Sequence, residues 1–256
     1  MTITKDIAPP RPHERAASSG PWGRLAPIVL FVVAALVAAQ SARMGLSGLI
    51  VELGQAEQDR WVATRRPPGL VEANRVAGYF AASLSYYPGN PWALEELGGL
   101  DLRRMRLSRK PGDALAFARA ARLRFREGLR QRPTSPFLWA NLALAKLYLD
   151  ELDAEFLAAL THADELGPWE PASQQVVLVA GLAAWDKLDA AQRRLVVGVV
   201  ERGAVRNSVK MFEILRNFGR FDLVCARRSY DSVAANECGK RAAPVPGRGL
   251  REWDRR

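Results

Sequence analysis

The sequence has few of the residues on which catalytic and metal sites usually depend. It contains only two histidines, His13 and His162, and two cysteines. HExxH, a paired CxxC, GxSxG and a phosphate-cradling glycine loop are all absent. The neighbouring carboxylates Glu95 and Glu96 would point about 100° apart on a helix, so they would not share one site. We therefore expect a protein that is not an enzyme and that needs no cofactor or metal.

The sequence also lacks a convincing run of the alternating pattern typical of strands. Apolar residues instead recur at intervals of three and four, which indicates helices. Proline- and glycine-containing breaks separate the helical segments. The pattern predicts an all-α fold with helices at 69–87, 92–107, 113–132, 137–150, 154–166, 172–188, 190–204 and 208–219.

One segment, Leu25–Ala42, carries no charge. As a helix its eighteen residues would reach roughly 27 Å, about one hydrocarbon core. Four basic residues precede it, whereas Arg43 is the only basic residue among the sixteen that follow. The positive-inside rule then places the N-terminus in the cytoplasm. We predict a single-pass inner-membrane anchor with the rest of the chain in the periplasm.

A cleaved signal peptide is the alternative, because the start is basic and the sequence AAQSA resembles a cleavage site. We favour the uncleaved anchor, since the apolar run is long and an amphipathic helix with Leu46, Leu49, Ile50 and Leu53 follows it. The predicted organisation is a disordered leader at 1–23, a transmembrane helix at 24–42, an amphipathic helix and linker at 43–67, a helical domain at 68–225 and a basic tail at 226–256.

Three of the breaks share the form proline–x–x–proline, at residues 88–91, 133–136 and 168–171. Their spacings are 45 and 35 residues, and the second is close to the 34 of a tetratricopeptide repeat. We therefore predict a tetratricopeptide-like stack of antiparallel helix pairs behind the membrane helix. Trp92, Trp139 and Trp169 lie at or near these breaks. Trp169 is interpreted as a packing wedge, with an exposed partner-binding anchor as the alternative, and Glu170 as a cap or a polar contact.

The basic charge is concentrated in one part of the chain. The net charge is +10, and residues 103–132 hold ten Arg and one Lys against Asp113 and Glu127, which gives +9. On a helix, Arg119, Arg122, Arg126 and Arg130 fall within roughly 80°, opposite the apolar side. This stripe is either a solvated face or a binding surface for an anionic polymer, lipid headgroups or an acidic protein. Either way, its replacement is expected to leave the core intact.

Cys225 and Cys238 are separated by twelve residues. In an oxidising compartment outside the membrane they would pair, so we predict a disulfide between them. The periplasmic assignment also disfavours a nucleic-acid partner, which the basic charge alone would permit.

The segments RPTSPFLWANLALAK, DAEFLAALTHADELGPWEP and FGRFDLVC, together with Trp185, resemble the VpsP-type family of exopolysaccharide biosynthesis proteins. This resemblance implies an accessory or scaffold role in making or exporting a surface polysaccharide, through contacts with other proteins of that machinery. It supplies no catalytic residue. The alternatives are a module that binds an anionic polysaccharide, and a tetratricopeptide-like assembly factor for other envelope complexes.

Overall fold

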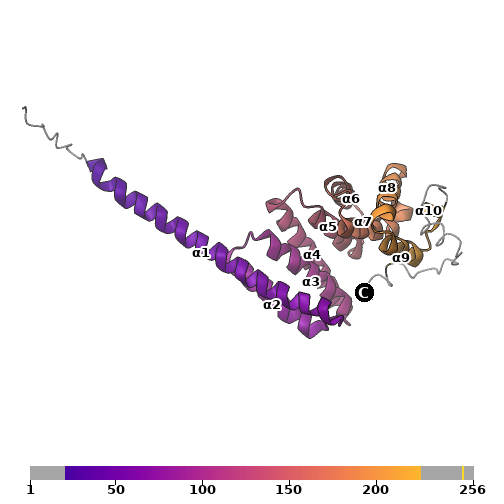
Figure 1. Cartoon of the computed structure of the whole chain (residues 1–256), viewed down its shortest axis with the longest axis horizontal. Coiled ribbons are helices and arrows are strands. Elements are labelled where there is room, and N and C mark those ends of the chain that lie inside the picture. The colour runs from indigo at the N-terminus through magenta and orange to yellow at the C-terminus, as the bar shows by residue number, and fades with distance from the viewer. Residues whose placement is uncertain (1–20, 226–249, 251–256) are drawn as a thin grey trace, which may run out of the picture. The chain divides into compact units, whose positions relative to one another are not determined.

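The structure is a computed structural model that describes residues 21–225 and Leu250. All regular elements among these residues are helices, and none is a strand (Figure 1). Almost all of the predicted leader lies outside the described residues, and so does the predicted tail apart from Leu250. The helices are α1 (Pro21–Thr64), α2 (Leu70–Tyr86), α3 (Pro91–Leu107), α4 (Pro111–Gln131), α5 (Pro136–Tyr148), α6 (Ala154–Leu166), α7 (Pro171–Ala183), the short 3₁₀ helix η1 (Trp185–Lys187), α8 (Ala190–Arg206), α9 (Ser208–Phe218) and α10 (Asp222–Cys225).

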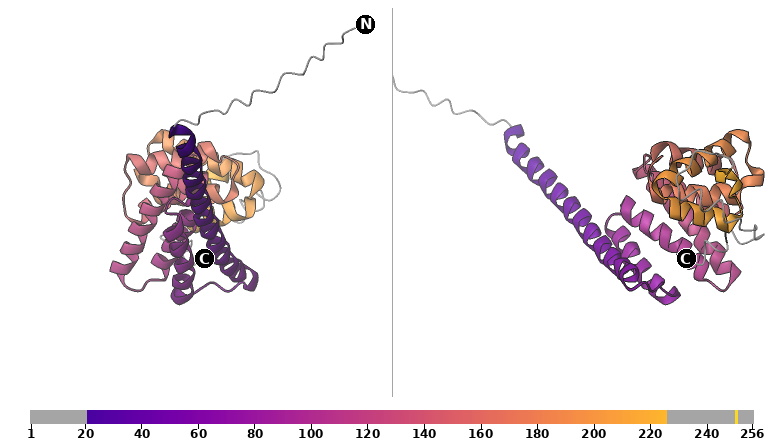
Figure 2. Two further views of the ribbon diagram at one scale, coloured as in Figure 1. Left: turned by 90° about the vertical axis from the view of Figure 1, so that its left-hand side faces the viewer. Right: turned by 45° about the vertical axis from the view of Figure 1, so that its right-hand side comes forward.

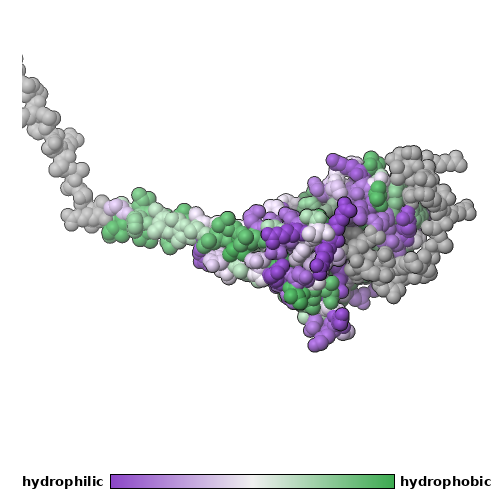
Figure 3. Space-filling view, turned by 60° about the horizontal axis from the view of Figure 1, so that its bottom comes forward, coloured by the Kyte–Doolittle hydropathy of each residue, from purple (hydrophilic) through white to green (hydrophobic). Residues whose placement is uncertain are grey.

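The chain divides into two units, residues 1–42 and 43–256. In the first unit, every described side chain from Leu25 to Ala42 is exposed, and Figure 3 shows this part of α1 covered by hydrophobic side chains. The helix is long and apolar enough to cross a membrane. Two details differ from the sequence prediction. Pro27 lies in the second turn of α1 and not in the first, and α1 continues past residue 42 without a break because no proline or glycine pair interrupts it there.

The second unit is a helical stack, as predicted. Figures 1 and 2 show its helices following one another through the stack in chain order. Helix α5 packs on α4, α6 and α7, and α7 packs in turn on α6, α8 and α9. Whether this stack is a tetratricopeptide-like repeat stays a prediction.

Proline residues begin several helices, as the sequence indicated. Pro91, Pro136 and Pro171 each occupy the first turn of a helix, where the missing N–H costs no hydrogen bond. The side chain of Asn90 accepts hydrogen bonds from the N–H groups of residues 92 and 93 at 3.1 and 3.3 Å, and Ser135 accepts one from residue 138 at 3.4 Å. Such caps satisfy N–H groups that the helix itself leaves unpaired.

Most of the described core lies between α4 and α9. Phe125, Phe156, Leu178 and Leu215 are fully buried there. A close approach between α3 and α4 depends on Gly98, because a Cβ atom at that position would come within 2.5 Å of the Phe125 ring. A smaller cluster joins the second half of α1 to α2 and α3. The stack therefore reaches into α1 and begins before the boundary at residue 68 that the sequence suggested.

Candidate functional site

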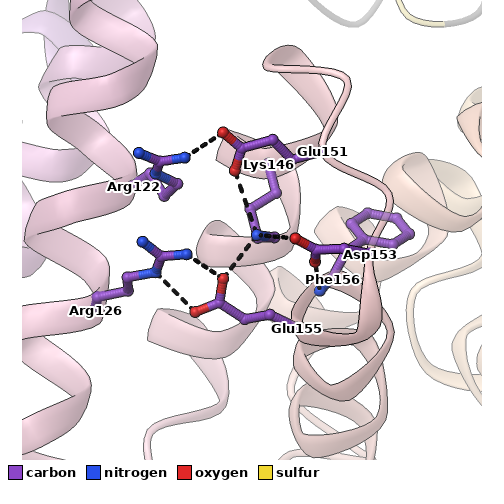
Figure 4. Close-up of polar contacts among 7 residues, drawn as sticks. All are labelled: Arg122, Arg126, Lys146, Glu151, Asp153, Glu155 and Phe156. Atoms are coloured by element: carbon purple, nitrogen blue, oxygen red, sulfur yellow. Dashed lines mark hydrogen bonds and ion pairs between the residues drawn. The ribbon is translucent and has the colours of Figure 1, made fainter.

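The arginine stripe of α4 is divided in the structure. Arg122 and Arg126 point from α4 toward the turn between α5 and α6, where Arg122 pairs with Glu151 and Arg126 with Glu155 (Figure 4). Arg126 Nε donates to Glu155 at 2.7 Å. Two members of the predicted anion-binding surface are therefore occupied by carboxylates of the same chain.

The centre of this network is Lys146 on α5, whose side chain has no exposed surface. Its ammonium group lies 2.7 Å from Glu155, 3.0 Å from Asp153 and 3.3 Å from Glu151. Figure 4 shows the three carboxylates converging on it from the α5–α6 turn and the start of α6. We call these four residues, together with Arg122 and Arg126, the Lys146 network.

The network shifts several pKa values. The hydrogen bond from Arg126, followed by contacts with Lys146, lowers the pKa of Glu155 from 4.5 to about 2. Burial alone would lower the pKa of Lys146, but its hydrogen bonds to Glu155, Asp153 and Glu151 outweigh burial and raise it. All these groups are thus held charged at neutral pH. Their arrangement suits a rigid ionic link between α4, α5 and α6, and it provides no group poised for proton transfer.

The other two arginines of the stripe differ from this pair. Arg130 pairs with Glu127 on its own helix, and its side chain is 74% exposed. Arg119 is exposed and makes no ion pair with the part of the chain that the structure describes. The single-stripe interpretation is therefore corrected, because the carboxylates that divide the stripe come from a turn some thirty residues away. Replacing all four is now expected to lower stability, because Arg122 and Arg126 would lose their ion pairs.

The structure also contains a buried carboxylate that the sequence did not lead us to expect. Asp101 on α3 is only 1% exposed at its side chain and pairs with Arg104 at 2.8 Å and Arg124 at 2.6 Å. The available signal was its position within the apolar run of WALEELGGLDL. A buried acid requires basic partners, and the arginine-rich segment supplies them.

The three proline junctions lie side by side along one edge of the stack, which we call the junction edge. A Cβ atom at Gly89, in the first junction, would lie 3.4 Å from the Gln131 side chain beside the second. A Cβ atom at Gly167, in the third, would lie 2.6 Å from Cβ of Pro136, so only glycine permits this approach. The hydroxyl of Ser173 also lies 3.4 Å from the Pro136 carbonyl oxygen.

Tryptophans mark this edge. Trp92 is 54% exposed and Trp169 is 50% exposed. Arg132 covers the Trp92 ring at 4.1 Å, and the Trp139 ring lies 4.7 Å from that of His162. The interpretation of Trp169 as a packing wedge is wrong, because half of its surface faces solvent. Its role as a partner anchor stays a prediction.

Glu170 occupies the N-cap position of α7, but its side chain makes no capping hydrogen bond. Its carbonyl oxygen accepts the usual first helical bond from the N–H of Gln174 at 2.9 Å. The Glu170 side chain is exposed, so its carboxylate is presented beside Trp169 on the junction edge. A capping role is therefore confined to its backbone.

A cleft of about 630 Å³ lies beside α8 and is lined by Trp185, Arg193 and Arg194. Its aromatic wall is already covered, since Arg220 lies 4.1 Å and Arg193 5.5 Å from the Trp185 ring. Arg220 also pairs with Asp222 at 2.9 Å. These contacts fix Trp185 in the fold and leave little of its ring for a ligand.

Within residues 21–225, no group of three or more His, Cys, Asp or Glu side chains is arranged to hold a metal ion. Nδ1 of His162 lies 3.7 Å from a carboxylate oxygen of Glu165, and these two side chains do not by themselves form a catalytic pair. Cys225 ends α10 and is disulfide-bonded, as predicted, whereas Cys238, the other cysteine of the sequence, lies outside the described residues.

Comparisons with protein-family models, with curated proteins and with solved structures found no match to this chain. The resemblance to VpsP-type proteins therefore stays a prediction, carried by the quoted segments alone.

Proposed function

We propose that this protein is a non-enzymatic scaffold, anchored in the inner membrane by α1, that holds together proteins which make or export an exopolysaccharide. The helical stack would be periplasmic and the N-terminus cytoplasmic. The pathway comes from the resemblance of RPTSPFLWANLALAK and GPWEP to VpsP-type proteins. The mode of action comes from the surface of the stack.

The observation that carries the proposal is the junction edge. Half-exposed tryptophans on a rigid helical framework are the kind of residue that dominates protein–protein binding energy. Leu166, 42% exposed, adds apolar surface next to Trp169. Proline and glycine hold this edge in a fixed shape, so little conformational entropy would be lost on docking.

The continuity of α1 supports an anchor that is retained. A cleavage after AAQSA would cut α1 in the middle of a helix. Directly beyond that point, Arg43 donates a hydrogen bond to the carbonyl oxygen of Tyr86 at 3.2 Å, and Ser47 bonds Ser83 at 2.7 Å. The residues after the span are thus part of the folded stack.

The test is a Trp169→Ala variant of the full chain in its own cells, with Leu123→Ala as the matched control. Leu123 is also exposed, at 58%, but lies on α4 away from the junctions. We expect Trp169→Ala to accumulate normally in the membrane and to lower both polysaccharide output and crosslinking to its partner, while Leu123→Ala changes neither. Full polysaccharide output after deletion of the whole gene would reject the pathway. Full output from Trp169→Ala alone would reject the junction edge as the docking surface.

A direct role in binding an anionic polysaccharide is the second candidate. The high positive charge favours it, although the structure removes Arg122 and Arg126 from the available surface. A role in assembling other envelope complexes is the third candidate, and the proteins crosslinked to the junction edge would distinguish it from the first.

A further inference from the structure

A second basic cleft lies where α1 ends. It has a volume of about 290 Å³ and is lined by Arg65, Arg66 and Arg103, with Trp61 and two prolines of the α1–α2 loop. Arg65 and Arg66 directly follow α1, whereas Arg103 lies in the second half of α3, directly before its last turn. Arginines some forty positions apart in the chain therefore line one small cleft.

These three arginines differ from their neighbours in having no carboxylate partner among the residues that the structure describes. The nearby acids that form ion pairs do so with other arginines, and Glu96 accepts a hydrogen bond at 2.7 Å from Gln58, which also lines the cleft. Glu57 pairs with Arg60 and Arg75, Glu95 with Arg132, and Asp101 with both Arg104 and Arg124. Where most arginines in this region are neutralised within the chain, the lining of this cleft retains its charge.

Retaining that charge is unfavourable without an anion. Burial, followed by repulsion from Arg106, lowers the pKa of Arg103. The backbone of Arg65 has φ of 52°, a left-handed conformation that is unfavourable for a non-glycine residue. Attraction to the C-terminal end of the helix α1 accounts for a basic residue at 65 or 66, but not for Arg103. A bound anion would offset the burial of Arg103 and its repulsion from Arg106.

The wall of the cleft is apolar and flat. Trp61 is partly buried against the smaller core cluster, and Pro67 and Pro68 complete the wall. Guanidinium groups bind carboxylate or phosphate through paired hydrogen bonds, and an aromatic ring can stack on a ring of the ligand. The volume lies at the lower end of the range for ligand pockets, which suits one unit of a polymer.

We propose that this cleft binds one acidic sugar unit of an anionic polysaccharide, with Arg66 and Arg103 holding its carboxylate and Trp61 stacking on its ring. The choice of a sugar rests on the proposed function, whereas the anion site rests on the cleft itself. The site moves anion recognition from the α4 stripe, whose central arginines are paired with carboxylates, to three arginines outside that stripe.

The experiment measures binding of a labelled uronic-acid oligomer to the full chain in a neutral detergent, by microscale thermophoresis. Variants Arg103→Gln and Arg66→Gln are compared with Arg119→Gln, an exposed arginine without an ion pair among the described residues and outside the cleft. Each cleft variant should weaken binding roughly tenfold, the loss of one charge-assisted hydrogen bond. Arg119→Gln should leave it unchanged. Arg103→Lys should give an intermediate loss of affinity, because lysine keeps the positive charge but lacks the paired N–H donors of the planar guanidinium group.

Three further probes decide the ligand class. A neutral glucan oligomer should not bind, and inorganic phosphate should compete only weakly with the uronate. Binding to phosphatidylglycerol vesicles that is lost in the cleft variants, without uronate binding, would assign the site to lipid headgroups and overturn the proposal. Equal weakening by Arg119→Gln would show nonspecific charge attraction and would also overturn it. Because Trp169→Ala tests docking on a different edge, either proposal can fail while the other stands.

Discussion

The Lys146 network predicts an asymmetry between its members. The buried charge is Lys146, with no exposed side-chain surface, whereas Glu155 keeps 34% of its side chain in water. Replacing Lys146 by Met removes the charge that is costly to bury, and leaves Glu151 and Glu155 with their arginines. Replacing Glu155 by Gln leaves that charge in place and removes its nearest partner.

The magnitudes follow from this difference. Removing one partner of a buried pair costs about 3–5 kcal/mol, and water access to Glu155 reduces this to about 2–3 kcal/mol for Glu155→Gln. Exchanging a buried ionic group for an apolar one of similar size is often nearly neutral, so Lys146→Met should cost less than about 1.5 kcal/mol. In the double variant, Glu155→Gln no longer leaves a buried charge without its partner. The free-energy cost of the double variant should therefore be smaller than the sum of the two single-variant costs, by about 1 kcal/mol or more.

The assay is urea unfolding of the full chain in a non-ionic detergent, followed by far-UV circular dichroism. Guanidinium chloride is unsuitable because it screens the ion pairs under study. A cost for Lys146→Met that exceeds the cost for Glu155→Gln would refute the reasoning, as would strict additivity in the double variant. The first result would mean that the ammonium group is a net stabiliser, and the second that Glu155 acts independently of it.

Three other predictions follow. The pKa of Glu155 is lowered from 4.5 to about 2, so the contribution of its carboxylate to the free energy of unfolding is complete above pH 4.5 and is lost as the pH falls toward 2. The urea concentration at the unfolding midpoint should drop over this pH range, and it should drop less in the Glu155→Gln variant. Non-reducing mass spectrometry of protein from its own cells should find Cys225 linked to Cys238, and two alkylatable thiols would contradict this. A reporter active only outside the cytoplasm should be active when fused after Arg256, whereas activity of a cytoplasmic reporter there would reverse the orientation.

The helices themselves could be predicted from the sequence with little error. The segment 154–166 coincides with α6, and the boundaries of α2 and α3 differ from the prediction by one residue. Proline at the first turn and capping side chains such as Asn90 are local signals, since they act on N–H groups within three residues. The apolar span could also be predicted from the sequence, because a helix that could cross a membrane is recognised by its length and composition alone.

The partners of charged and aromatic side chains depended on tertiary structure. Periodicity placed Arg122 and Arg126 on one face of α4, but only packing of α4 against the α5–α6 turn supplied Glu151 and Glu155 as their partners. The same holds for Trp169, whose 50% exposure the sequence did not reveal.

The sequence by itself determined the all-helical class, the positions of most helices and the apolar N-terminal span, because propensity, capping and hydrophobic length are properties of short segments. The tertiary structure alone decided which arginines are neutralised and which remain available. An ion pair depends on separations of a few ångströms between residues far apart in the chain, and no local pattern encodes such a distance. Arg65, Arg66 and Arg103 therefore became a candidate site only when the end of α1 was seen to pack beside α3.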